Sequence, residues 1–179
     1  FRGITTTRDA HAAGAAIHSQ HADCLLSAPS STTGPWDPYQ GMISNAQYFT
    51  TLFNSSYDKL GLISYSSQGT LRRNLSSNFS QIRSDMDAIV YPTGGTNSAH
   101  GIAVGRQVLD GSGKRTNAVR VLVFLTDGRA NSYCGATYAA SNYNSTSCPS
   151  QGGGNDGNSS AVNAANQEAM RLAAANDTY

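Results

Sequence analysis

The run Val119-Arg120-Val121-Leu122-Val123-Phe124-Leu125 is the most hydrophobic stretch in the chain, and Thr126-Asp127-Gly128 follows it directly. Its length and its β-branched side chains predict a strand that is buried on both faces, as inner strands of a parallel sheet are. Ligands of such sheets bind at the carboxyl ends of the strands. Asp127 therefore stands where a functional residue is expected.

Strand and helix patterns alternate on both sides of that run. Short strands are predicted at residues 60–63 and, more polar and suited to a sheet edge, at 70–75. Apolar residues that recur every three or four positions predict helices at 41–53, 79–90, 98–109 and 161–175. Gly101 and Gly105 would let another element approach the third helix closely. The alternation predicts a three-layer α/β fold, a Rossmann-like doubly wound and mainly parallel sheet with helices on both faces.

The composition narrows the class of protein. A length of 179 residues predicts one domain, and twelve Lys and Arg against eleven Asp and Glu give a net charge of +1. That balance argues against nucleic-acid binding, and no apolar run is long enough to predict a membrane span. The chain starts without Met and ends where the alternation would require another strand. We therefore expect a piece of a longer protein, incomplete at both ends.

Cysteine usage indicates the compartment. Cys134 and Cys148 flank a polar stretch rich in Gly, Asn, Ser and Tyr, which has no apolar periodicity. A disulfide between them would stabilise the fold by about 3 kcal/mol and give this insertion, about residues 132–150, a defined shape. Two unpaired thiols are the alternative. Cys24 is left over, either free or paired elsewhere. With only 13% charged residues, the pattern favours an exported protein, secreted or held at the cell surface.

Three motifs together resemble a von Willebrand factor A-type domain. They are residues 58–67 (DKLGLISYSS), Gly94-Gly95-Thr96-Asn97 and residues 121–128 (VLVFLTDG), in the order and spacing of that family. The likeness spans about residues 41–175 and looks most like bacterial surface members, such as those linked to tight-adherence pili. It divides the chain into an N-terminal segment, 1–38, irregular or a degenerate first strand, and a domain at 39–179.

The resemblance implies a metal-ion-dependent adhesion site (MIDAS) built from three loops. Two loops match and give Thr96 and Asp127 as ligands of Mg²⁺, for which Mn²⁺ or Ca²⁺ could substitute, while an acidic side chain of a protein ligand completes the coordination sphere. The first loop, D-x-S-x-S, is not found. In the nearest stretch, residues 23–31 (DCLLSAPSS), Ser27 and Pro29 replace the aspartate and the middle serine. The alternative is that Asp127 caps a turn and Thr96 caps the following helix.

The same resemblance places the central strand of the sheet in this N-terminal region, between the strand at 60–63 and the run at 119–125. Residues 24–27 are a poor match for that strand. Either they fill the place badly, or residues are missing or altered here, or another chain donates a strand.

Several other side chains permit two interpretations. Serines at the end of the first strand could support the metal site or simply be hydrated; they are Ser64, Ser66 and Ser67. His100 could help to cap its helix. Tyrosines near the cysteines could form a contact surface or pack within the insertion; they are Tyr133, Tyr138 and Tyr143.

Two further patterns are weaker. One group could form a zinc cluster on a helical face or be solvated; its members are His11, His18, His21 and Cys24. Asn-x-Ser/Thr motifs would be glycan acceptors in a eukaryotic secreted protein or could arise by chance; they are Asn54, Asn74, Asn78, Asn144, Asn158 and Asn176.

We therefore expect an exported adhesion or assembly module that binds a protein ligand through a Mg²⁺-dependent site at the carboxyl edge of the sheet. The alternative is a structural filament or stalk subunit that uses the fold without metal and packs against neighbouring subunits. We expect no enzyme, because no serine has a histidine and an acid in a catalytic motif.

Overall fold

The computed structural model describes residues 38–90, 94–115, 117–126, 129–135, 138–144, 147–148, 151–153 and 159–176. The chain divides into two compact units, 1–46 and 47–179, and helix α2, Pro38–Thr50, crosses the boundary between them. The other elements belong to the second unit. Cys24, the stretch at 23–31 and the three N-terminal histidines lie outside the described residues.

The two predicted short strands form an antiparallel hairpin. Strand β1, Leu60–Tyr65, pairs with β2, Gly69–Ser76, in a register that places Ile63 opposite Leu71 and Leu62 opposite Arg73. The register shifts between these two pairs, so no residue of β1 stands opposite Arg72 and the hairpin bulges there. Within the described residues, β1 and β2 make a two-stranded sheet.

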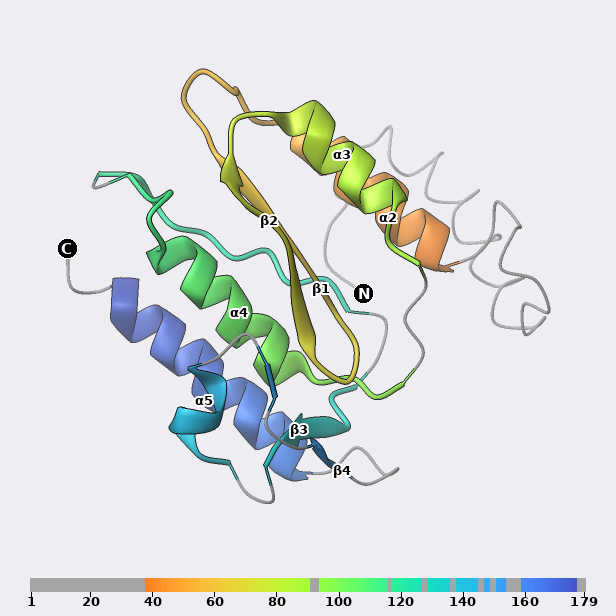
Figure 1. The fold of residues 1–179 in the computed structure, drawn as a ribbon, viewed down its shortest axis with the longest axis vertical. Helices are drawn as coiled ribbons and strands as arrows, with labels where there is room; N and C mark the ends of the chain where they lie inside the picture. The colour runs from red at the N-terminus through yellow and green to blue at the C-terminus, as the bar shows by residue number, and fades with distance from the viewer. Residues whose placement is uncertain are drawn as a thin grey trace, which may run out of the picture. The chain divides into compact units, whose positions relative to one another are not determined.

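Helices pack on both faces of the hairpin (Figure 1). Alternate β1 residues face helix α4, Ser98–Asp110, because Tyr65 lies against Gly101 and Ile63 lies near Gly105. The side chain of Leu62 points to the face opposite that of Tyr65 and Ile63, because side chains alternate along a strand. Arg73, which pairs with Leu62, forms an ion pair on that face with Asp85 of helix α3, Phe79–Asp87. The chain thus has the α/β architecture that the alternation predicts.

Helix α4 is the centre of the described core. Its first eight residues are all buried, because the hairpin packs on one side and helix α5, Ser159–Asn176, on another (Figure 1). A Cβ at Gly101 would lie 3.0 Å from the Tyr65 ring, and one at Gly105 would lie 2.8 Å from Leu122. The predicted role of these two glycines in close approach is therefore confirmed.

The hydrophobic run at 119–125 is extended, but the prediction of a strand buried on both faces is wrong. Val119 is 91% exposed and Val121 66% exposed. The alternate residues Leu122 and Phe124 face inward, where Phe124 stacks on Tyr65 with ring centroids 4.8 Å apart. Both strand pairs in the described residues are antiparallel, and neither includes this run. Its outer face is exposed because no described element covers it.

The insertion contains structure that the sequence pattern does not reveal. Strands β3, Ser132–Cys134, and β4, Gln151–Gly153, pair antiparallel, and a 3₁₀ turn, η1, spans Ala140–Tyr143. The disulfide Cys134–Cys148, expected from the cysteine spacing, is present in the structure. Within the described parts of the chain, no helix has both the length and the hydrophobicity to cross a bilayer.

Candidate functional site

Three loops meet at the N-terminal end of α4, and we call them the rim: residues 66–68, 94–97 and 131–132. The Asn97 N–H donates to the Ser66 carbonyl at 2.7 Å, which joins the first loop to the second. The Asn131 N–H donates to the Thr96 carbonyl at 3.0 Å, which joins the second loop to the third. The structure thus brings the serine loop after β1 beside the Gly-Gly-Thr-Asn motif, as the sequence predicts.

The paired glycines of the motif allow this close assembly. Gly94 has a φ of +124°, and a Cβ there would lie 2.5 Å from Ser67 Oγ. A Cβ at Gly95 would lie 2.9 Å from Ser132 Cβ, and the Gly95 N–H donates to Ser67 Oγ at 3.0 Å. Any side chain at either position would push the three loops of the rim apart.

Thr96 is held by its backbone while its hydroxyl makes no hydrogen bond within the described residues. Its N–H donates to Asn131 Oδ1 at 2.6 Å, and its carbonyl accepts from Asn131. The alternative that Thr96 caps α4 is wrong, because Asn97 Oδ1 accepts the His100 N–H at 3.0 Å and is the N-cap. The half-buried Thr96 hydroxyl is therefore available to a ligand at the rim.

The described donors of the rim suit a hard cation in type but carry no charge. Ser66 and Thr96 offer neutral hydroxyl oxygens of the kind that Mg²⁺ accepts, whereas the Ser67 hydroxyl already accepts a hydrogen bond. In the described ranges, no three His, Cys, Asp or Glu side chains are placed to hold a metal. Asp127, the predicted source of negative charge, lies outside the described residues, so its role as a ligand stays a prediction.

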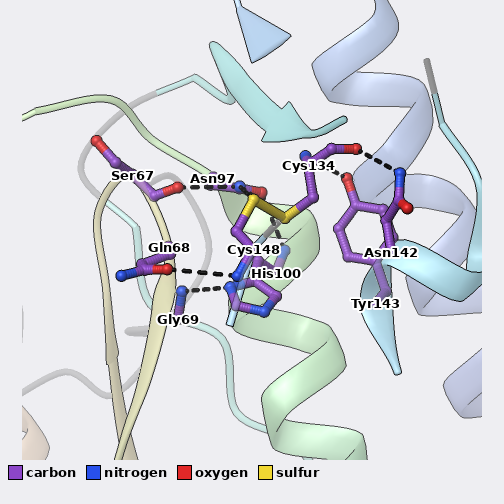
Figure 2. Close-up of a disulfide and its surroundings, with 9 residues drawn as sticks. All are labelled: Ser67, Gln68, Gly69, Asn97, His100, Cys134, Asn142, Tyr143 and Cys148. Atoms are coloured by element: carbon purple, nitrogen blue, oxygen red, sulfur yellow. Dashed lines mark hydrogen bonds between the residues drawn. A yellow bond between two sulfur atoms is a disulfide. The ribbon is translucent and has the colours of Figure 1, made fainter. Parts of the chain in front are cut away.

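The disulfide lies directly beside the rim (Figure 2). The Asn97 side chain is fully buried, and its Nδ2 donates to the Ser67 carbonyl at 3.0 Å. The same Nδ2 lies 3.5 Å from Cys134 Sγ and 3.9 Å from Cys148 Sγ. The Cys148 N–H donates to Gln68 Oε1 at 3.4 Å. The bridge therefore contacts two of the three loops of the rim.

His100 fastens α4 to the hairpin and does not cap its own helix. Its Nδ1 accepts the Gly69 N–H at 2.9 Å, and the whole side chain is buried. Its ring also faces Tyr143, with ring centroids 6.2 Å apart. An acceptor at Nδ1 requires that this nitrogen carry no proton. His100 therefore supports the rim as a neutral side chain.

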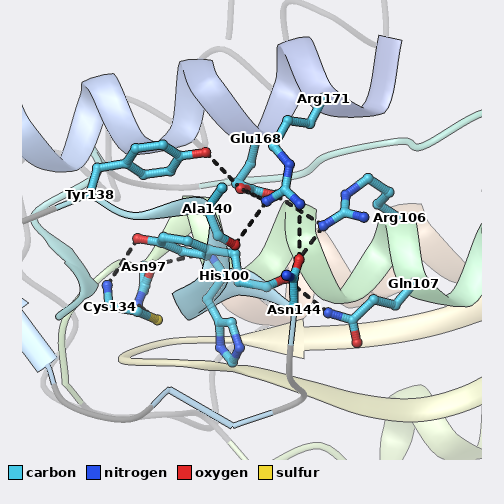
Figure 3. A network of polar contacts seen from close by, with 11 residues as sticks. Asn97, His100, Arg106, Gln107, Cys134, Tyr138, Ala140, Asn144, Glu168 and Arg171 are labelled. Atoms are coloured by element: carbon cyan, nitrogen blue, oxygen red, sulfur yellow. Dashed lines mark hydrogen bonds and ion pairs between the residues drawn. The ribbon is translucent and has the colours of Figure 1, made fainter. Parts of the chain in front are cut away.

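A buried carboxylate ties the insertion to the helices (Figure 3). Glu168 of α5 is fully buried and accepts from Arg171 at 2.6 Å and from the Tyr138 hydroxyl at 3.0 Å. Arg106 of α4 lies 3.4 Å from its second oxygen. Burial and the neighbouring Glu168 both raise the pKa of Tyr138. Arg106 and Arg171 thus offset the charge of Glu168, the only buried carboxylate of the described residues, and the Tyr138 hydroxyl donates a hydrogen bond to it.

The tyrosines of the insertion are packing residues, and the prediction that they could form a contact surface is wrong. Tyr143 is fully buried, and Tyr133 is 9% exposed. Tyr143 stacks on Tyr138, and its hydroxyl oxygen accepts the Cys134 N–H at 2.9 Å. Burial is the main reason that the pKa of Tyr143 is raised.

A shallow groove lies away from the rim, at the start of α3. Its volume is about 430 Å³, and hydroxyl side chains form most of its wall, with Arg83 as its charged residue. None of the predicted site residues lines it.

Sequence reasoning missed two residues that build the rim. Asn131 fixes Thr96, and Gln68 contacts the disulfide segment. Both act across more than thirty residues of sequence, where no local pattern marks the pairing. Gly-Gly-Thr-Asn and the serines after the first strand are the signals that the sequence holds for this region.

A family model described as von Willebrand factor type A domain matches residues 37–129. This stretch is just over half of the chain and includes β1, β2, α3 and α4 with two of the three loops of the rim. Comparison with curated proteins gives no match, and comparison with solved structures gives none either.

Proposed function

We propose that this chain, which belongs to the von Willebrand factor type A domain family, binds a protein ligand at the rim. Domains of this family commonly mediate protein–protein interaction and adhesion. The observation that carries the proposal is Thr96, whose backbone is hydrogen-bonded on both sides while its hydroxyl is unused. A backbone fixed in this way holds the polar side chain in position for a ligand.

The finer proposal is that Thr96 and Asp127 hold Mg²⁺ at the rim. Their hydroxyl and carboxylate oxygens are the hard donors that this ion prefers, and Mn²⁺ or Ca²⁺ could substitute. Bound Mg²⁺ would supply an open coordination position for an acidic side chain of the ligand protein. Asn131 holds the Thr96 backbone in place, and the paired glycines keep the three loops of the rim close together.

The setting that we propose is outside the cell, at a bacterial surface and in association with a pilus. The disulfide supports export, since such bridges persist in oxidising compartments. The Ser- and Asn-rich composition and the resemblance to tight-adherence members support the surface role. We propose a binding module and not an enzyme, because no serine of the sequence has a histidine and an acid in a catalytic motif.

Calorimetric titration of the oxidised protein with MgCl₂ tests the metal proposal. Wild type should release or absorb heat with a defined midpoint, and Asp127→Ala and Thr96→Val should each lose at least about tenfold in affinity. Thr51→Val is the matched control, because Thr51 is an exposed threonine that lines the groove away from the rim. Absence of binding in wild type, or equal binding in all four proteins, would refute the site.

A metal-free structural role is the second candidate function, and the exposed valines of the 119–125 run favour it. An apolar outer face at Val119 and Val121, uncovered within the described residues, suits packing against neighbouring filament subunits. Sedimentation in EDTA separates the two candidates. Assembly that rises with concentration and weakens in Val121→Lys supports the structural role, whereas a stable monomer contradicts it.

A further inference from the structure

We propose that thiol–disulfide exchange at Cys134–Cys148 regulates the rim, with Cys148 as the sulfur that is attacked. The inference deepens the proposed function and rests on it, because such regulation matters only if the rim binds a ligand. The oxidised form is the binding form, and the reductant is a dithiol.

The bridge lies against the rim, next to Asn97. Asn97 Nδ2 lies between the Ser67 carbonyl, 3.0 Å away, and the two sulfurs, 3.5 and 3.9 Å away (Figure 2). One buried amide thus contacts both the first loop of the rim and the bridge. The Cys148 N–H adds a second contact to the same loop through Gln68.

Burial makes the two ends of the bridge unequal. Cys134 is fully buried in β3, and its N–H is bonded to the Tyr143 hydroxyl, whereas Cys148 is half-buried. A reductant can therefore approach Cys148 Sγ more easily than Cys134 Sγ. Asn97 Nδ2 lies closer to Cys134 Sγ, at 3.5 Å, than to Cys148 Sγ, at 3.9 Å, so it can donate a hydrogen bond to the Cys134 thiolate as that thiolate leaves. The easier access to Cys148 Sγ therefore makes Cys134 the leaving group.

The exchange balances with a dithiol as the electron donor. Its thiolate attacks Cys148 Sγ, the S–S bond breaks, and Cys134 leaves as a thiolate that takes up a proton. The second thiol of the reductant then displaces Cys148 from the mixed disulfide and closes the reductant's own disulfide. Two electrons pass from the dithiol to the protein, which is left with two thiols.

Reduction should loosen the rim without unfolding the domain. Cys134 keeps its place in β3 through its bond to Tyr143, and Asn97 keeps its cap on α4. Cys148, by contrast, loses its covalent tether to β3 and is then held by non-covalent contacts, such as its N–H bond to Gln68 Oε1. The Ser67 loop then loses the covalently held neighbour that packs against it.

Hydrogen exchange of the oxidised and the dithiothreitol-reduced protein tests the inference without any metal. A Cys24→Ser background keeps the third cysteine out of the exchange. Upon reduction, the amides of Gly95 and Asn97 should exchange at least tenfold faster, while Ile82 in α3 keeps its rate. Iodoacetamide should label Cys148 before Cys134. The variant Asn97→Ser retains a capping oxygen but lacks the amide donor, and its rim should respond less to reduction.

The outcomes separate this inference from the proposed function. Equal exchange at the rim in both redox states overturns the regulation, and so does global unfolding upon reduction, because the bridge would then be a structural staple. In the Mg²⁺ titration, the reduced protein should bind at least fivefold more weakly than the oxidised protein. Oxidised protein that binds no Mg²⁺ refutes the proposed metal site, while hydrogen exchange still decides whether the bridge controls the rim.

Discussion

At the scale of single residues, Asn131 decides the geometry of the rim, although nothing in the sequence marks it. Its side-chain oxygen and its N–H both bind the backbone of Thr96. The cysteine pair could be predicted from its spacing, and Thr96 was proposed as a site residue through the resemblance to a von Willebrand factor A-type domain. Asn131 and His100 act on partners that only the folded chain brings near, so their roles could not be predicted.

Replacement of Asn131 tests that role. Asn131→Ala should lower the free energy of unfolding by about 1–3 kcal/mol, because the Thr96 N–H loses its acceptor in a half-buried loop. Asn131→Asp keeps an oxygen at the same position and should retain most of the stability. Urea denaturation followed by circular dichroism measures both variants. Equal loss in the two would show that the acceptor oxygen is not what matters.

The buried carboxylate gives a second residue-scale prediction. Glu168→Gln should lower the free energy of unfolding by about 3 kcal/mol, because Arg106 and Arg171 would keep their charges without a counter-ion. The control is Gln167→Ala, an exposed neighbour on α5, which should change stability by less than about 0.5 kcal/mol. Guanidinium denaturation distinguishes the two; a Glu168→Gln protein as stable as wild type would contradict the network.

The ion pair between Arg73 and Asp85 predicts a dependence on pH. The hydrogen bond from Arg73 is the main cause of the lowered pKa of Asp85, against an opposing effect of burial. An acid with a lowered pKa stabilises the fold above its unfolded pKa and loses that contribution as pH falls through the folded pKa. Wild type should therefore exceed Asp85→Asn in stability by a constant amount above about pH 5.

Thermal unfolding across pH 2–7 measures that difference. The gap between wild type and Asp85→Asn should shrink as the pH falls below about 4, the ordinary pKa of an aspartate, and should close once Asp85 of the folded protein is protonated. A gap that is independent of pH would show that the charge of Asp85 contributes nothing.

At the scale of elements, the helices and the two short strands were predictable, whereas the antiparallel pairing of those strands and the burial of the hydrophobic run were not. Asn78 caps α3, as its position before an apolar-periodic stretch indicates. The α2 prediction at 41–53 lay three residues too late, since the helix already begins at Pro38, a residue that a first turn tolerates.

The run at 119–125 has the composition of a strand buried on both faces, but its neighbours decide its burial, and composition carries no information about them. Strands β3 and β4 are three residues each, too short for a periodicity to appear.

A pair of substitutions tests the one-sided burial of that run. Leu122→Ala should lower the free energy of unfolding by about 2–4 kcal/mol, because Leu122 packs against α4 at Gly105. Val121→Thr should change it by less than about 0.5 kcal/mol, because Val121 is 66% exposed. Chemical denaturation compares the two proteins. A similar large loss in both would restore the strand buried on both faces.

At the scale of the whole molecule, the alternation of strands and helices predicted the α/β architecture, and the three motifs that resemble a von Willebrand factor A-type domain predicted the family. Burial of α4 between the hairpin and α5 follows from its small residues, which the sequence shows. Two of the three loops of the rim could be predicted, namely the serines after β1 and Gly-Gly-Thr-Asn, because each has a motif at the end of a strand or the start of a helix. The contribution of the disulfide to the rim could not be predicted, because the spacing of the cysteines predicts the bridge but not which residues the bridge contacts.

The most direct test of the central claim is a titration of isotope-labelled, oxidised protein with MgCl₂, followed by amide chemical shifts. The rim should respond first, with saturable shifts at Ser66, Gly95, Thr96 and Asn97, and Asp127→Ala should abolish them. Shifts confined to the groove near Arg83, or none at any Mg²⁺ concentration that leaves the protein folded, would contradict a metal-dependent binding site at the N-terminal end of α4.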